Sequence, residues 1–282
     1  MNDPAFDSSA LASSPLGAQG LTLAYGKRAV IRNLDLALPA RRVTAIVGPN
    51  GCGKSTLLAG LARLHTPETG HVTLDGRDIR EFGGRELARA LALLPQSVSA
   101  PEGLTAAELI RFGRQPHQGW LRHWSAEDAR VVSAALAAAD LEALADRPLD
   151  AMSGGQRQRA WIAMTVAQQT PLLLLDEPTT ALDLGHAIEV FELIRELAAA
   201  GKTVVMVLHD LVNACRYADH LIAMRAGEII AAGAPSEVVT TDLVRELYGI
   251  DCTLLADPGT GSPVLTNLRR TREPAPACAV SR

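Results

Sequence analysis

The sequence predicts an α/β fold built on a mostly parallel sheet, and three patterns predict it. Two short apolar runs, 171–178 and 202–210, flank an amphipathic helix over 184–197, whose apolar residues recur at spacings of three and four. A third run, 41–48, is rich in β-branched residues and ends in glycine, as expected of a buried strand. Because strand–helix–strand units place their strands in parallel, functional residues are expected at the carboxyl ends of these strands.

Composition and charge exclude several classes of protein. The 282 residues are 48% hydrophobic but only 4% aromatic, and the net charge is −4. That charge gives no electrostatic case for binding nucleic acid. The sequence also contains no run of 18 apolar residues, which is about the length needed to span a bilayer. Four scattered cysteines, with no Cys-x-x-Cys pair, argue against a disulfide or metal framework. We expect an intracellular protein without a signal peptide, either free or docked on a membrane through a partner.

Composition also divides the chain into parts. The N-terminal residues and those from Arg269 onward are rich in Ser, Ala or Pro, as in flexible tails. The middle contains Ala- and Leu-rich helical segments and no convincing strand, which indicates an inserted helical subdomain. The predicted parts are a tail (1–18), a core in two pieces (19–96 and 169–250), the helical subdomain (97–168) and a short extension with a flexible end (251–282).

The segment GPNGCGKST follows the strand at 41–48 and precedes an apolar helix. It satisfies G-x-x-x-x-G-K-[ST] in the context that this phosphate-binding loop requires. Its amides are expected to wrap phosphates, while Lys54 pairs with β- and γ-phosphate oxygens and Ser55 offers its hydroxyl to Mg²⁺. With only three lysines in the chain, an accidental glycine-rich turn is disfavoured. The predicted nucleotide-binding residues of this phosphate loop are Gly48, Pro49, Asn50, Gly51, Cys52, Gly53, Lys54, Ser55 and Thr56.

The apolar run at 171–178 leads into two adjacent acids. Asp176 is placed to hold Mg²⁺ through water, and Glu177 to polarise an attacking water as a general base. The pair could merely cap a helix, but beside a phosphate loop it predicts hydrolysis of the nucleotide. His209 ends the next strand and could sense the γ-phosphate or orient water, or be structural. Gln96 lies where the core meets the helical subdomain and could reach Mg²⁺ or water, or be a solvated loop residue.

A second glycine turn, Ser153-Gly154-Gly155-Gln156, precedes a helix. Such a turn leaves backbone N–H groups free for an anion. A helix N-terminus attracts an anion by only about 0.3–1 kcal/mol when exposed and about 2 kcal/mol when partly buried. That is too weak to capture free nucleotide but enough to close over bound nucleotide. We predict that this turn contacts nucleotide held by a second copy, in a self-complementary dimer; the alternative is a plain helix cap.

Together these motifs resemble the ATP-binding subunit of ABC transporters over residues 20–250. The order of motifs is the phosphate loop, Gln96, SGGQ, LLLLDE, Ala181-Leu182-Asp183 and His209. The resemblance implies a P-loop NTPase core with an antiparallel β portion near the N-terminus and the inserted helical subdomain. It also implies ATPase activity, with ATP and Mg²⁺ bound.

The same resemblance assigns three further sites. It implies that Tyr25 stacks on adenine, that Asp183 lies at the dimer seam, and that residues 153–156 contact the γ-phosphate of the opposite copy. The sequence departs from the family's usual leucine at Met152. Little effect is expected, because the two side chains have similar volume.

Three stretches narrow the resemblance to importers of iron–siderophore complexes, with haem or cobalamin importers as the alternative. They are GRQPHQGW, DEPTTALDLGHAIEVFELI and HDLVNACRYADHLIAM. Such an ATPase works with separate permease subunits, expected to dock near 97–120, and indirectly with a substrate-binding protein. It would lie peripherally on the cytoplasmic face of the inner membrane. A soluble ABC-type ATPase without a transporter is disfavoured, because the chain has no tandem domain and no coiled-coil or basic insert.

Overall fold

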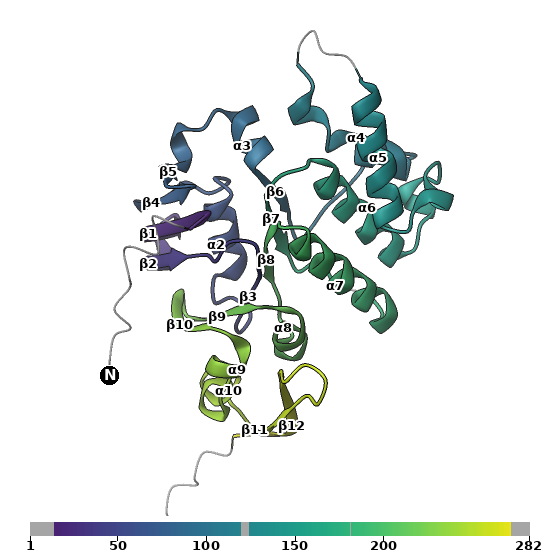
Figure 1. The fold of residues 1–282 in the computed structure, drawn as a ribbon. Coiled ribbons are helices and arrows are strands. Elements are labelled where there is room, and N and C mark those ends of the chain that lie inside the picture. The colour runs from purple at the N-terminus through teal and green to yellow at the C-terminus, as the bar shows by residue number, and fades with distance from the viewer. Residues whose placement is uncertain (1–13, 120–123, 181, 272–282) are drawn as a thin grey trace, which may run out of the picture.

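A computed structural model describes residues 14–119, 124–180 and 182–271 (Figure 1). Its central sheet has the order β10-β9-β3-β8-β7-β6, with β10 antiparallel to β9 and the other five strands parallel to one another. The prediction of an α/β fold with a mostly parallel sheet is therefore confirmed. The strands are β3 (Val43–Val47), β6 (Leu91–Leu94), β7 (Leu172–Asp176), β8 (Thr203–Val207), β9 (His220–Arg225) and β10 (Glu228–Gly233).

The inner strands β3, β7 and β8 are buried along their whole length. Successive side chains of a strand point to opposite faces of the sheet. On β7, for example, Leu173 and Leu175 join one hydrophobic core, and Leu172 and Leu174 join another. A parallel sheet covered on both faces requires such uninterrupted apolar runs, which is why the sequence signal was strong.

A four-stranded antiparallel sheet, β2-β1-β4-β5, forms the second layer. Helix α2 (Lys54–Leu61) lies between this sheet and the central sheet, because Leu57, Leu58 and Leu61 share one core with residues of both (Figure 1). The antiparallel β portion expected near the N-terminus is thereby confirmed. Its strands are β1 (Leu16–Tyr25), β2 (Arg28–Ala37), β4 (Thr69–Leu74) and β5 (Arg77–Asp78).

Strand β1 begins inside the segment predicted as a tail. Leu16 and Ala18 are fully buried, and the Ser14 hydroxyl donates to the carbonyl oxygen of Leu38 at 2.8 Å. The prediction is wrong for residues 14–18, because two apolar side chains on one face of a strand suffice to join the core despite the Ser- and Ala-rich surroundings. Residues 1–13 lie outside the described residues.

The helical subdomain has a core of its own, in which α4, α5 and α6 pack together. Each helix begins at a side-chain cap, because Thr105, Ser125 and Ser153 each accept a hydrogen bond from the backbone N–H three residues later. Met152 is buried in this core, as a substitute for leucine should be. The elements are α4 (Ala106–Phe112), η2 (Gln115–His117), α5 (Ala126–Ala138), η3 (Glu142–Leu144), η4 (Leu149–Ala151) and α6 (Gly154–Ala167).

A buried ion pair joins the three helices of the subdomain. The Arg114 side chain, 3% exposed, donates from Nε to Asp128 Oδ1 at 2.9 Å, and Asp128 is 1% exposed. Nη1 of Arg114 also donates to the Ala167 carbonyl and to Gln169 Oε1, each at 2.8 Å. Burial alone would raise the pKa of Asp128, but hydrogen bonds from Ser125 and Arg114 outweigh it and lower that pKa to about 2.

We expect Asp128→Asn to lower the free energy of unfolding by about 3 kcal/mol, because it leaves a buried guanidinium without its counter-charge. Glu127→Gln, which breaks only an exposed pair with Arg130, is the control and should cost less than about 1 kcal/mol. Since the folded pKa of Asp128 lies below its ordinary 3.8, its stabilisation is complete above that value and is lost as the pH falls toward 2. Urea unfolding of the wild type and both variants at neutral and acidic pH measures these free energies. An equal loss of unfolding free energy in Asp128→Asn and Glu127→Gln at neutral pH would contradict the prediction.

Side chains also fasten the subdomain to α3 (Gly84–Ala90) of the core. Gln168 Nε2 donates to the Ala88 carbonyl at 2.6 Å, and Arg89 Nε donates to the Pro116 carbonyl at 2.8 Å. A ring nitrogen of His117 lies 2.7 Å from the Gln168 carbonyl oxygen. The Arg-Gln-Pro-His part of GRQPHQGW therefore has a structural role, while Trp120 lies outside the described residues.

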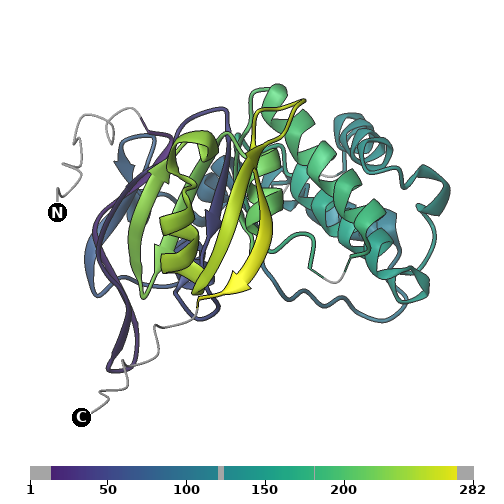
Figure 2. The ribbon, with the colours of Figure 1, turned by 90° about the horizontal axis from the view of Figure 1, so that it is seen from below.

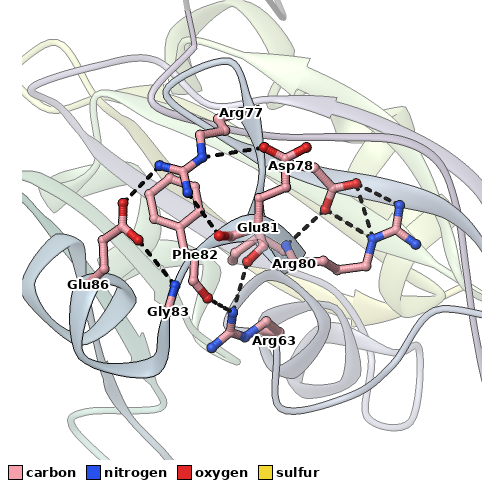
Figure 3. Close-up of polar contacts among 9 residues, drawn as sticks. Arg63, Arg77, Asp78, Arg80, Glu81, Phe82, Gly83 and Glu86 are labelled. Atoms are coloured by element: carbon pink, nitrogen blue, oxygen red, sulfur yellow. Dashed lines mark hydrogen bonds and ion pairs between the residues drawn. The ribbon is translucent and has the colours of Figure 1, made fainter.

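Arginines fix the turn that leads from β5 through η1 (Ile79–Glu81) to α3 (Figure 3). Arg77 pairs with Glu86 at 2.8 Å and with Glu81 at 3.4 Å, and its guanidinium lies 4.1 Å from the centre of the Phe82 ring. Arg63, just past α2, donates to the Phe82 carbonyl. These exposed pairs contribute little energy individually. Together they link β5, η1 and the first turn of α3 to one another.

The remaining helices cover the other face of the central sheet. On α7 (Leu184–Ala199), Phe191 and Ile194 are buried as the periodicity predicted, but Leu184 is 75% exposed and does not belong to the core. Leu184 is the first residue of the helix, and its exposed side chain lines an open cavity beside His209. The other helices are α8 (Leu211–Tyr217), α9 (Pro235–Val238) and α10 (Thr241–Tyr248).

The predicted C-terminal extension contains an antiparallel hairpin of β11 (Ile250–Ala256) and β12 (Pro263–Arg270). β11 packs against α10 and β12 against α8 (Figure 2). Arg269 and Arg270, predicted to belong to the flexible end, pair with β11 in this hairpin, so the prediction is wrong for these two residues. The residues that follow Thr271 lie outside the described residues. Over the described ranges, no helix combines the length and the apolar character needed to cross a membrane.

Candidate functional site

The phosphate loop joins the end of β3 to the start of α2, and its glycines are required by close contacts. A Cβ atom on Gly48 would lie 2.1 Å from the Met224 carbonyl oxygen. Gly53, the N-cap of α2, has φ +108°, and a Cβ there would lie 2.8 Å from the side chain of Ile31. The loop is therefore pressed against its own sheets, and its backbone can approach a ligand from the other side.

Lys54 begins α2 and is buried. Its ammonium group donates to the carbonyl oxygens of Gly48 at 2.8 Å and Pro49 at 3.2 Å, so it curls back over the loop. The first turn of α2 contains no acidic residue. The positive end of the helix dipole and the ammonium charge therefore act on the same small region, as an anion site requires.

Asp176 ends β7 beside the phosphate loop. Ser55 Oγ donates to Asp176 Oδ1 at 3.1 Å, and Asp176 is 7% exposed. Burial raises the pKa of this carboxyl, with a further increase from the neighbouring Glu177, although the Ser55 hydrogen bond and Lys54 act in the opposite sense. Among the described residues, no group of three His, Cys, Asp or Glu side chains could cage a metal. One carboxylate plus one hydroxyl fits Mg²⁺, which commonly takes its remaining ligands from phosphates and water.

Glu177 is the point where three segments meet. Its Oε2 accepts hydrogen bonds from Gln96 Nε2 at 3.0 Å and Thr180 Oγ1 at 2.9 Å, and His209 Nδ1 lies 3.8 Å from the same atom. Its φ of 51° is unusual for a residue with a side chain and is held by the bond from its N–H to the Val207 carbonyl. The structure thus brings the three predicted catalytic residues, Gln96, Glu177 and His209, together.

Thr180 belongs to this site, although sequence reasoning did not identify it. Its backbone N–H donates to the Glu177 carbonyl at 3.2 Å, so a tight turn returns its hydroxyl to the carboxylate. A hydroxyl residue three positions after an acid, across a proline, was the available signal. Thr180 also lines a cavity of about 360 Å³ together with His209 and Leu184.

The signature turn, defined here as Ser153–Gln156, forms a capping box at the start of α6. Gln156 N–H donates to Ser153 Oγ at 3.2 Å, and Ser153 N–H donates to Gln156 Oε1 at 3.1 Å. The turn therefore forms the helix cap that the alternative interpretation predicts. This cap does not test whether the turn also contacts a ligand. α6 contributes Ile162 to the core on one face of the sheet, whereas α2 packs on the other face. None of the described hydrogen bonds joins the turn to the phosphate loop.

Asp183 caps α7. Its Oδ1 accepts from the His186 N–H at 3.0 Å, and its Oδ2 lies 2.8 Å from His186 Nδ1. These bonds, first the backbone and then the side-chain one, lower the pKa of Asp183. Leu182, its neighbour in the Ala-Leu-Asp motif, lines the cavity beside His209, while Ala181 lies outside the described residues.

Tyr25 ends β1, and the residue is 57% exposed. The ring centre lies 4.6 Å from that of His65, at an interplanar angle of 40°. A ring nitrogen of His65 in turn lies 2.9 Å from the Ala24 carbonyl oxygen. An exposed aromatic face supported from beside is suited to stacking, and the adenine contact stays a prediction.

Alkylation of Cys52, inside the phosphate loop, is expected to block nucleotide binding, and bound nucleotide to protect it. Cys52 is 4% exposed, and burial raises the pKa of its thiol despite the nearby Lys54. Because the thiolate is the reactive form, we expect slow labelling that accelerates as the pH rises. Peptide mass spectrometry after iodoacetamide treatment should find the half-buried Cys252 labelled before Cys52. Faster labelling of Cys52, or equal labelling of it with and without ATP, would contradict this geometry.

Comparison with known proteins places this site in a family. A family model described as ABC transporter matches residues 31–180. The chain is 50% identical to the ferric enterobactin transport ATP-binding protein FepC of Escherichia coli (strain K12), over 94% of this chain and 97% of the relative. It is 44% identical to the hemin import ATP-binding protein HmuV of Streptomyces coelicolor, over 87% of each chain.

Solved structures agree with these sequence relatives. An ABC transporter of metal-chelate type in an inward-facing conformation matches with a TM-score of 0.77 and 27% identity, over 91% of this chain and 97% of that one. A bacterial ABC transporter cassette solved as a dimer matches with a TM-score of 0.69 and 28% identity, over 78% and 98%. Since the family model spans more than half of the sequence and the relatives nearly all of it, the chain belongs to the ABC transporter family.

Proposed function

We propose that this chain is the ATP-hydrolysing subunit of an importer for iron–siderophore complexes. The observation that carries the cargo assignment is the 50% identity to a ferric enterobactin transport subunit, over nearly the full length of both chains. The lower identity to a hemin import subunit, 44%, makes haem the second candidate. A soluble ATPase without a transporter is disfavoured, because both of these relatives are transport subunits.

ATP binds at the phosphate loop. The backbone amides of Gly51–Thr56 and the ammonium group of Lys54 contact the β- and γ-phosphates, and Tyr25 stacks on adenine. Ser55 and Asp176 are the residues that would hold Mg²⁺, which supplies positive charge to the phosphate oxygens when it is bound. The buried Asp176 carboxyl and the Ser55 hydroxyl 3.1 Å from it support this assignment.

Glu177 then acts as the general base for hydrolysis. Gln96 and Thr180 both donate to Oε2, which fixes the carboxylate, and none of the described hydrogen bonds uses Oε1. Oε1 can therefore accept the proton of a water that attacks the γ-phosphate. His209, 55% exposed at its side chain and 3.8 Å from Oε2, is placed to orient that water or the γ-phosphate.

A second copy of the chain completes each site. Helix α6, which begins with the signature turn, packs on the opposite face of the sheet from α2. The first turn of α6 contains no acidic side chain that would compete with a phosphate for its backbone amides. ATP held by one copy is closed over by the turn of the other, in a two-fold arrangement. Because ATP binds the closed dimer better, binding drives closure and hydrolysis reopens it. The match to a cassette solved as a dimer supports this arrangement.

Closure moves the helical subdomain together with the permease subunits docked near 97–120. A substrate-binding protein would deliver cargo to the outer side of these permeases. The chain would then act at the cytoplasmic face of the membrane without crossing it. The support for these partners is the naming of its relatives as transport and import subunits.

Uptake of radioactive iron tests the proposal. A strain that lacks this gene should recover uptake of ferric enterobactin when it expresses the wild-type chain, and not when it expresses Lys54→Ala. Labelled haem given to the same strains tests the second candidate. Recovery of haem uptake alone would replace the siderophore assignment, and recovery of neither would overturn the importer proposal.

A further inference from the structure

His186 is a histidine to which the hydrolysis mechanism assigns no role, yet it lies between two segments of that mechanism. It stands in the first turn of α7, three residues after Asp183. Its side chain is 33% exposed, compared with 69% for Asp183. The ring is therefore partly buried and partly exposed. Its two contacts are the carboxylate of Asp183 and the backbone of Gly155, and the dimer proposal places both of these residues at the surface that meets the second copy.

The first contact is with Asp183. Nδ1 of His186 lies 2.8 Å from Asp183 Oδ2, while the backbone N–H of His186 donates to Oδ1 at 3.0 Å. Because an ionised carboxylate can only accept, Nδ1 carries the proton in this contact. The backbone bond fixes one carboxylate oxygen as in any helix cap, and the side-chain bond fixes the other. The rotation of the Asp183 carboxylate is thus determined by His186.

The second contact is with the signature turn. A Cβ atom on Gly155 would lie 2.8 Å from Cγ, 3.0 Å from Cδ2 and 3.1 Å from Cβ of His186. Three ring or near-ring atoms at similar distances mean that the imidazole lies against the Gly155 backbone, where any side chain would displace it. Glycine at 155 is therefore needed for this packing, in addition to any role in exposing amides.

Other contacts between α6 and α7 lie further along the helices. Arg159 Nη1 approaches Glu189 Oε2 at 3.4 Å, one turn beyond the signature turn. His186 is the contact nearest to the N-terminal ends of both helices among those described. Those two ends carry the signature turn and Asp183, which the dimer proposal places against the second copy.

We propose that His186 is a positioning residue that locks Asp183 and the signature turn into one rigid surface, which is presented to the second copy. The proposal rests on the ATP-bridged dimer proposed above. Pre-ordering both segments lowers the entropy lost when the dimer closes. The ring supplies two separable things, a donor for Asp183 and a flat apolar face for Gly155.

Substitutions can separate these two contributions. His186→Asn keeps a donor at the δ position but removes the ring, and His186→Phe keeps a ring but removes the donor. His186→Ala removes both. Glu192→Ala, an exposed position on the same helix, is the matched control. Each change is made in the Glu177→Gln chain, so that ATP-bound dimers can accumulate.

The measurement is dimer formation against ATP concentration by size-exclusion chromatography with light scattering. We expect His186→Ala to weaken ATP-driven dimerisation about tenfold, the range for losing one charge-assisted hydrogen bond and its packing, with Asn and Phe in between. ATP affinity of the monomer and the unfolding midpoint should match those of the control, since the phosphate loop of the same chain is untouched. A general loss of folding would instead shift both readouts.

The outcomes distinguish this inference from the proposal beneath it. If Glu177→Gln alone forms no dimer with ATP, the dimer proposal fails, and the role of His186 fails with it. If that chain dimerises and His186→Ala dimerises at the same ATP concentration, the inference alone is overturned. Recovery by Asn but not Phe would assign the effect to the donor, and recovery by Phe but not Asn to the ring, and either supports a positioning role.

Discussion

Glu177→Gln should abolish turnover while leaving ATP bound. The amide keeps an oxygen that can accept from Thr180, so the geometry of the turn should persist, but it cannot take a proton from water. Loss of a general base lowers a rate by about 10²- to 10⁴-fold. Because ATP closes the dimer and hydrolysis reopens it, the variant should accumulate as an ATP-bound dimer.

Phosphate release and light scattering measure these two effects on the same sample. Glu192→Gln, an identical chemical change at an exposed position of α7, is the control and should hydrolyse at the wild-type rate. Hydrolysis by Glu177→Gln within about twofold of wild type would remove Glu177 from the general-base role. Asp176, which shares the end of the strand, would then be the acid to test.

Mixed dimers should show which copy's nucleotide the signature turn contacts. Ser153→Asp keeps a good helix cap but adds a negative charge facing the γ-phosphate, and Ser153→Asn is the neutral control with an equally good cap. Lys54→Ala removes the charge that binds phosphate in the phosphate loop. A dimer with Ser153→Asp in one copy and Lys54→Ala in the other should retain one intact site, since both lesions fall on the same composite site.

Nucleotide stoichiometry in the Glu177→Gln background provides the readout, independent of cooperativity in turnover. The dimer with one lesion in each copy should trap about one ATP. The dimer with both lesions in a single copy, beside an unaltered partner, should trap none. The reverse pattern would place the signature turn in the site of its own chain.

Local sequence pattern determined the elements that carry the chemistry. The continuous apolar runs predicted β3, β7 and β8, because strands covered on both faces need apolar residues at every position. The phosphate loop was predicted from its glycines, which a tight backbone turn requires. The roles of the adjacent acids Asp176 and Glu177 were predicted from their position at the end of a strand. In each case a few neighbouring residues were sufficient, since backbone period and loop chemistry are short-range properties.

Tertiary structure decided which of these residues act together. Gln96 and Glu177 are separated by 81 positions, and they meet because β6 pairs with β7 in the central sheet. His209 joins them because β8 pairs with β7 on its other side. The sequence predicted β7 and β8 but neither β6 nor the order of the strands, because strand order depends on which apolar faces cover one another. The same long-range packing placed the start of β1 in the core and His186 against Gly155, and no local pattern encodes either contact.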